Sequence, residues 1–225
     1  MNSRLPRLVI VPRALLIVED LGGLAPIAAE LRQCAREAVA TLWSDDEQGA
    51  PGGVAIITGR APGESSHETS TPGSFRPYGV ETTVSNGTEL PELLGRWLIE
   101  DYDPMVQATC YESIVEALAA GHTCVLVLVD GAFGLADNSP VGAIAGAVEI
   151  DALCSKIAGQ DAVVANVENI KFPAPGEYAA ELWQQLNRAT ECLVGAGMAV
   201  VKRVYYDGAP YGIGYHVASW QCVAK

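Results

Sequence analysis

The segment that most constrains the fold is the run Thr-Cys-Val-Leu-Val-Leu-Val at 123–129, which is apolar throughout. A strand with one face in water alternates polar and apolar side chains. A strand that is apolar on both faces is typical of a mostly parallel sheet covered by helices on both sides. Asp130 and Gly131 end the run. The segment therefore predicts an α/β fold built on a covered, mostly parallel sheet.

The rest of the chain alternates between strand and helix patterns. The expected strands are 8–11, 54–57, 105–109, 198–206 and 213–222, and the expected helices are 26–41, 91–99, 111–120, 148–158, 177–195 and, more weakly, 161–170. The turn signal Asp-Gly-Ala-Pro at 207–210 joins the last two strands into a C-terminal antiparallel hairpin. Lys202 shares a strand face with valines, which favours an edge position for 198–206.

No internal repeat and no linker divide the sequence, so we expect a single α/β domain over residues 1–225. The segment 59–75 is rich in Gly, Ser, Thr and Pro, with almost no apolar side chain before Phe75. Such a composition gives little to bury against the entropy lost on ordering. We expect a mobile loop there.

The charge balance excludes several classes of partner. The 225 residues carry 27 acidic and 14 basic side chains, a net charge of −13, which would be repelled by nucleic acid and by anionic membranes. No apolar run approaches the roughly 20 residues that a membrane span needs, and no signal-peptide cleavage pattern follows the apolar start. We expect a soluble, cytoplasmic protein, and its six widely spaced cysteines favour scattered thiols over a disulfide or zinc framework.

Several common enzyme motifs are absent from the sequence. There is no P-loop, no dinucleotide-binding glycine fingerprint and no G-x-S-x-G nucleophile elbow. The three histidines, His67, His122 and His216, are too far apart for a metal motif on one helix. Any metal site would have to be assembled from distant segments.

Polar residues follow most of the expected strands, at the sheet edge where open α/β folds bind ligands. They are Arg13 after the first strand, Arg60 and His67 after the second, Asp130 and Asp137 after 123–129, and Asp207 after 198–206. Two cations and several carboxylates at one edge predict a site for a small anionic or polar ligand. The alternative for Asp130 and Asp207 is a turn-forming role, since each precedes a glycine.

The histidines and the C-terminal aromatic residues have competing interpretations. His67 lies in a polar loop, so it is either a ligand contact or a solvated surface residue, and His122 is interpreted as structural. His216 shares a strand face with Gly214, Ala218 and Trp220, which leaves room for a ligand or for a closely packed helix. Tyr211 joins the candidate ligand-binding residues, although its aromatic cluster is more typical of a core or a dimer interface.

Three segments carry a resemblance to a known family: LVIVPRALLIVEDLGG at 8–23, LVLVDGAFGLADNSPVG at 126–142 and YYDGAPYGIGYHVASW at 205–220. Their order and spacing resemble the LigB-type proteins, which are related to the class III extradiol ring-cleavage dioxygenases. The last segment resembles a divergent actinobacterial group of that family, which shares the form D-x-A-P-Y-G-[IV]-G-Y.

The resemblance implies a mostly parallel α/β sheet and, in active members, an Fe²⁺ ion held by two histidines and a glutamate, with a further histidine as acid/base. This chain departs from that pattern. Arg13 follows Pro12 where the first histidine is expected, 58–60 reads Thr-Gly-Arg at the second, and His216 stands four residues before Trp220 in place of the glutamate. An arginine is electrostatically wrong for a metal site.

We therefore expect a dioxygenase-like protein with a degenerate metal site, non-catalytic and without a cofactor, that binds a small anionic or polar ligand or a protein partner. One alternative is an active metal-dependent oxidoreductase with a rebuilt Fe²⁺ or Zn²⁺ site made by His67, His216 and Asp130 or Asp207. The other is a structural protein that forms a homodimer through its aromatic C-terminal hairpin.

Overall fold

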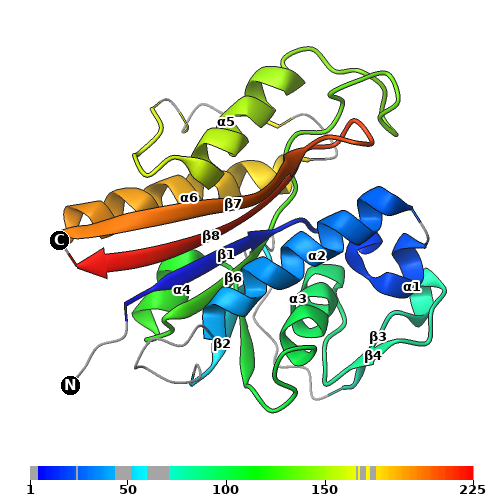
Figure 1. Ribbon diagram of the computed structural model, residues 1–225, viewed down its shortest axis with the longest axis horizontal. Helices are drawn as coiled ribbons and strands as arrows, with labels where there is room; N and C mark the ends of the chain where they lie inside the picture. Colours follow the sequence, from blue (N-terminus) through cyan, green and yellow to red (C-terminus); the bar gives the residue numbers. More distant parts are fainter. Residues whose placement is uncertain are drawn as a thin grey trace.

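A six-stranded sheet forms the centre of the molecule, with the strand order β5-β2-β6-β1-β8-β7 (Figure 1). The computed structural model describes residues 5–23, 25–43, 52–59, 71–165, 167, 171–172 and 176–224. Four strands run parallel: β1 (Arg7–Val11), β2 (Val54–Ile57), β5 (Ala108–Tyr111) and β6 (Cys124–Leu128). The strands β7 (Met198–Gly208) and β8 (Tyr215–Ala224) form an antiparallel hairpin at one side. The predicted α/β class is confirmed, and so is the hairpin.

Strand β6 lies inside the sheet, as its composition predicts. It pairs in parallel with β1 on one side and with β2 on the other, so that Val125 lies between Leu8 and Ala55. All five of its residues are buried. A strand in this position has no face in water, which is why its sequence does not alternate.

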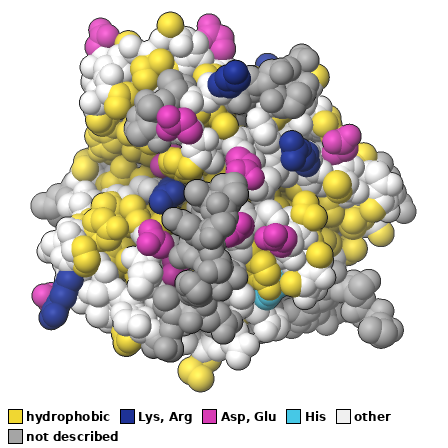
Figure 2. Space-filling model, turned by 180° about the vertical axis from the view of Figure 1, so that it is seen from behind, with side chains coloured by type: hydrophobic (Ala, Val, Ile, Leu, Met, Phe, Trp, Pro, Cys, Tyr) yellow, Lys and Arg dark blue, Asp and Glu magenta, His cyan; other side chains and the backbone are white. Residues whose placement is uncertain are grey.

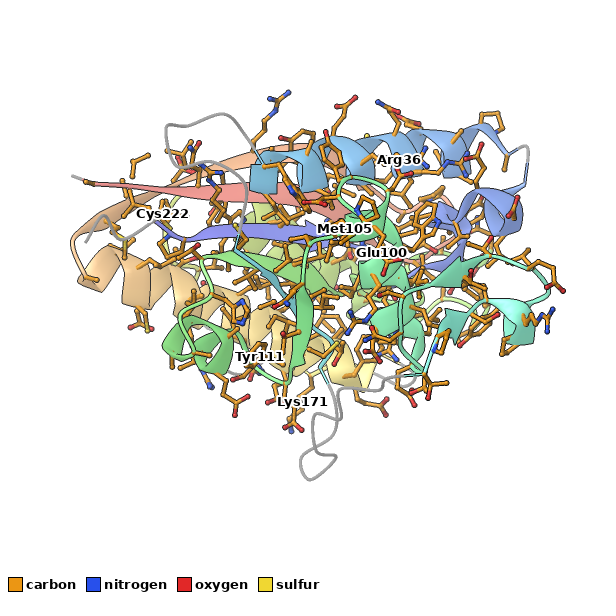
Figure 3. The ribbon with its side chains drawn as sticks, turned by 90° about the horizontal axis from the view of Figure 1, so that it is seen from below. Arg36, Glu100, Met105, Tyr111, Lys171 and Cys222 are labelled. Carbon is orange, nitrogen blue, oxygen red and sulfur yellow. The ribbon has the colours of Figure 1, made fainter. Side chains whose placement is uncertain are left out.

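Helices cover both faces of the sheet. On one face α2 (Pro26–Ala40) and α3 (Leu90–Glu100) pack against alternate residues of the parallel strands. On the other face α4 (Ile114–Ala119), α5 (Ala147–Gly159) and α6 (Glu177–Gly195) pack against the remaining ones. Figure 3 shows the sheet edge-on between α2 and α6. Two apolar cores result, one on each side of the sheet.

Short elements complete the described part of the chain. The 3₁₀ turn η1 (Leu15–Ile17) and the helix α1 (Glu19–Gly22) follow β1, and the 3₁₀ turn η2 (Thr41–Trp43) follows α2. The strands β3 (Gly73–Ser74) and β4 (Thr83–Val84) form a separate two-stranded sheet, and the 3₁₀ turn η3 (Arg76–Tyr78) lies between them in the sequence. Among the described residues no helix is both long and apolar enough to cross a bilayer. Figure 2 shows acidic side chains scattered between apolar ones over the face opposite that of Figure 1.

Three segments differ from the sequence prediction. Strand β5 begins at Ala108, three residues after the predicted start, and helix α4 begins at Ile114 because Ser113 caps it by accepting the Glu116 N–H at 3.2 Å. The predicted helix 161–170 is wrong for 161–165, which are not helical, while 166 and 168–170 lie outside the described residues.

The physical reason for the missing helix is that its backbone groups bind side chains of other elements. Asn187 of α6 accepts from the Val164 N–H and donates to the Val164 carbonyl, both at 2.9 Å. Of the segment 59–75, residues 60–70 lie outside the described part, and its end forms β3 and the fully buried Phe75.

Candidate functional site

The carboxyl ends of β1 and β6 form the candidate site. The chain leaves β1 toward α2 on one face of the sheet, and it leaves β6 toward α5 and α6 on the other face. Neighbouring parallel strands whose connections diverge in this way open a crevice at their ends, where α/β proteins bind ligands. The backbone N–H of Arg13, two residues after β1, donates to Oδ1 of Asp130, two residues after β6, at 2.9 Å.

Asp130 is buried beyond the end of β6, with 5% of its surface exposed. The hydroxyl of Tyr178, from the first turn of α6, donates to Asp130 Oδ2 at 2.7 Å, and the Trp183 indole donates to the Asp130 carbonyl at 2.9 Å. Burial raises the pKa of the Asp130 carboxyl to about 6, although the hydrogen bonds from Tyr178 and Arg13 lower it. This carboxyl therefore titrates close to neutral pH.

The Arg13 guanidinium lies over the ring of Tyr178, with its Cζ 4.7 Å from the ring centroid. This cation–π contact fixes a positive charge beside the ends of β1 and β6. Within the described part of the chain, no carboxylate or carbonyl accepts a hydrogen bond from the guanidinium. The planar fork of its N–H donors suits a carboxylate or an oxyanion.

His216 lies beside this site in a separate polar network. Its Nδ1 is 3.0 Å from Asp207 Oδ1, its Nε2 is 3.1 Å from Asp151 Oδ1, and its ring packs edge-on against Trp183. Burial lowers the pKa of His216, but the hydrogen bonds and charges of the two carboxylates outweigh it and raise the pKa to about 9. At neutral pH the ring is an imidazolium whose two nitrogens both donate, so neither offers a lone pair to a metal or to a substrate.

The same network holds the chain that follows Asp130. Asp151 Oδ1 also accepts the Ala132 N–H at 2.9 Å, and the backbones of Gly131 and Gly214 pair through a hydrogen bond of 2.8 Å. A Cβ added at Gly214 would lie 1.8 Å from Asp151 Oδ1, and one added at Gly131 would lie 2.3 Å from it. Glycine at both positions lets the Asp151 carboxylate reach His216.

The predicted site residues have different positions in the structure. Arg13 and Asp130 are brought together, and so are Asp207 and His216, where Asp207 also accepts from the Ser155 hydroxyl at 2.5 Å. Asp137 is exposed in the connection between β6 and α5, and Tyr211 is partly exposed in the turn before β8. Arg60 and His67 lie outside the described residues.

Sequence reasoning missed Tyr178 and Asp151. Tyr178 belongs to the apolar stripe of α6, and the signal that was available is that a buried tyrosine hydroxyl needs a hydrogen-bond partner. Asp151 lies between apolar residues of α5, where an isolated carboxylate on a packed helix also requires a partner. Neither signal says which partner it is.

A hollow of about 420 Å³ lies elsewhere, between α2, β7 and the segment that follows α3. Its lining includes Arg36, which Figure 3 labels on α2, together with Arg203 and Tyr205. Arg36 already pairs with Asp101 at 2.9 Å. No buried carboxyl of the described residues lines this hollow, so we place the candidate site at the carboxyl ends of β1 and β6.

No protein-family model matches the sequence, and no curated protein matches it. Among the described residues, no group of three or more His, Cys, Asp or Glu side chains is arranged to hold a metal ion. The candidate site therefore has to be interpreted from its own geometry.

Proposed function

We propose that this protein binds a small anionic ligand in the crevice between the ends of β1 and β6, with Arg13 as its cationic anchor. One observation carries the proposal: the Arg13 guanidinium is held 4.7 Å from the Tyr178 ring centroid, and no acceptor among the described residues binds it. A fixed guanidinium that binds no acceptor among the described residues, at the ends of two parallel strands, favours a carboxylate or another oxyanion.

Asp130 and Tyr178 orient Arg13 without a hydrogen bond to its guanidinium. Asp130 accepts the backbone N–H of Arg13 and the hydroxyl of Tyr178, so it fixes both the chain and the stacking ring. Burial and the Asp130 charge raise the pKa of Tyr178, which stays a phenol and a hydrogen-bond donor. The ligand thus meets a preorganised arginine.

The scaffold that we propose is that of the LigB-type dioxygenases, without their iron chemistry. The order of the three resembling segments supports the scaffold, and Arg13 after β1 opposes a cation in the same crevice. We infer that the protein does not cleave catechol-type rings. We further propose a cytoplasmic location, where the six free thiols stay reduced.

A rebuilt Fe²⁺ or Zn²⁺ site is the alternative that measurement of metal content tests. That site needs His216, whose Nε2 and Nδ1 both bind carboxylates at 3.1 and 3.0 Å, together with His67. Stoichiometric iron or zinc in protein purified without chelators, lost in His67→Ala, would establish the alternative and contradict our proposal.

The direct test is calorimetric titration with sulfate and with benzoate. We expect binding by the wild-type protein and at least a tenfold loss in Arg13→Gln. Arg203→Gln is the matched control, because the Arg203 Cζ also lies 4.7 Å from a tyrosine ring centroid, that of Tyr205, but on β7. Equal affinities of Arg13→Gln and wild type for both anions would refute the proposal.

A further inference from the structure

We propose that anion binding at Arg13 is coupled to the uptake of one proton by Asp130. This inference rests on the proposed function, and it adds how the site is regulated. Affinity for an anion would then rise as the pH falls, and bound anion would hold Asp130 in its neutral form.

The geometry that supports the coupling is the position of Asp130 directly behind Arg13. The Asp130 carboxyl is buried, and its two oxygens accept from the Arg13 N–H and from the Tyr178 hydroxyl. An anion on the Arg13 guanidinium would therefore lie next to a second negative charge in a poorly solvated place. Like charges in such a place disfavour double ionisation.

The other titratable groups that face Asp130 compensate its charge only in part. Among the described residues these groups are Tyr178 on α6 and both Tyr215 and His216 on β8. The two tyrosines have raised pKa values and stay neutral. The His216 charge also lowers the pKa of Asp130, but both ring nitrogens of His216 are bound to other carboxylates, those of Asp151 and Asp207. An anion bound to Arg13 would compensate the Arg13 charge. The ionised form of Asp130 would then lose the stabilisation that this charge provides.

Protonation of Asp130 costs no hydrogen bond. The neutral carboxyl keeps an oxygen that accepts the Arg13 N–H, and its new O–H can donate to the Tyr178 hydroxyl oxygen, because a phenol is both donor and acceptor. The proton comes from solvent. Burial already raises the pKa of Asp130 to about 6, so a bound anion that raises it by about two further pH units leads to uptake of nearly one proton at pH 7.

The experiment is a calorimetric titration with sulfate, which stays dianionic from about pH 5 to pH 8. We expect the wild-type affinity to be nearly constant below pH 6 and to fall by about tenfold for each pH unit above it. Asp130→Asn should bind independently of pH and about tenfold more tightly than wild type at pH 7. In wild type at pH 7, titrations in buffers of different ionisation enthalpy should report close to one proton taken up per sulfate.

Asp101→Asn is the matched control, because Asp101 also contacts a stacked arginine, Arg36, but away from the crevice. This control should keep the wild-type pH dependence. Arg13-dependent sulfate binding with no proton uptake, or with the same pH slope in Asp130→Asn, would overturn the coupling and leave the proposed function standing. Absence of Arg13-dependent sulfate binding at every pH would refute both the coupling and the proposed function. The number of protons that the wild-type protein takes up per sulfate tests the coupling even where Asp130→Asn does not fold.

Discussion

Asp130 and His216 are both buried and both have raised pKa values, but for opposite physical reasons. Asp130 receives hydrogen bonds from an N–H and a hydroxyl, which do not offset the loss of solvation of its charge. His216 lies between two carboxylates, which more than offset the same loss. One residue therefore tends toward its neutral form and the other toward its charged form, within a single sheet edge.

The first prediction at this scale concerns the stability that His216 supplies. Its folded-state pKa of about 9 lies above the ordinary value of 6.5, so its contribution is complete below pH 6.5 and is lost as the pH rises through about 9. A shift of that size corresponds to about 3 kcal/mol. We expect His216→Gln to lower the free energy of unfolding by about that amount at pH 6 and by much less at pH 9.5, as measured by urea denaturation. An equal loss at both pH values would contradict the charged-histidine assignment.

Residues that follow the strands of a parallel sheet lie at the same sheet edge. This rule predicted that Arg13 and Asp130 lie close together, because β1 and β6 are parallel neighbours. Tyr178 could not be predicted as their partner, since its contact with Asp130 spans 48 residues and depends on the rotational position of α6 over the sheet. Asp151 reaches His216 across 65 residues, and only the glycines at 131 and 214 make room for it. Such contacts depend on packing, which a local pattern does not encode.

At the scale of elements, α3 approaches the sheet unusually closely at one glycine. A Cβ at Gly95 would lie 2.8 Å from Ile56 Cγ2 on β2 and 3.3 Å from Leu128 Cδ2 on β6. The helix therefore lies at a depth that only glycine permits, and the apolar pattern of α3 alone does not reveal that depth.

We predict that Gly95→Ala destabilises the protein by about 1–3 kcal/mol, because overpacking outweighs the roughly 1 kcal/mol gained in helix propensity. Gly195→Ala is the control, since a Cβ at the last residue of α6 meets no atom within 4 Å. Thermal unfolding measures both variants. A Gly95→Ala protein as stable as Gly195→Ala would show that α3 can shift without cost.

The sequence predicted the long elements better than the short ones. The apolar pattern placed α6 at Glu177–Gly195 with the same bounds, because a nineteen-residue stripe is long enough to define its period. The segment 161–165 has the residues of a weak helix, yet Asp161 and Val164 bind Lys202 and Asn187 instead. Where an element is short, tertiary hydrogen bonds decide its structure.

At the scale of the whole molecule, β7 is the last strand of the sheet and is the place where a second copy would add to it. Two exposed valines, Val201 and Val204, lie on this strand. Two features oppose such pairing. Asp161 Oδ1 accepts the Lys202 N–H at 3.0 Å on the outer side of β7, and the strand register is irregular between Val204 and Tyr206. Charged side chains and irregularities at a sheet edge are devices that prevent edge-to-edge association.

The net charge of −13 acts in the same direction, because two copies repel each other over a Debye length of about 10 Å at 0.1 M salt. We therefore predict that the wild-type protein is monomeric in sedimentation velocity at 20 mM NaCl. Asp161→Ala frees the Lys202 N–H, so this variant should self-associate more strongly than wild type, and more at 500 mM than at 20 mM NaCl, where screening weakens the repulsion. Glu149→Ala removes the same charge from α5 and should not promote association. A wild-type dimer that persists at micromolar concentration in 20 mM NaCl would contradict this account and favour a dimeric role for the C-terminal hairpin.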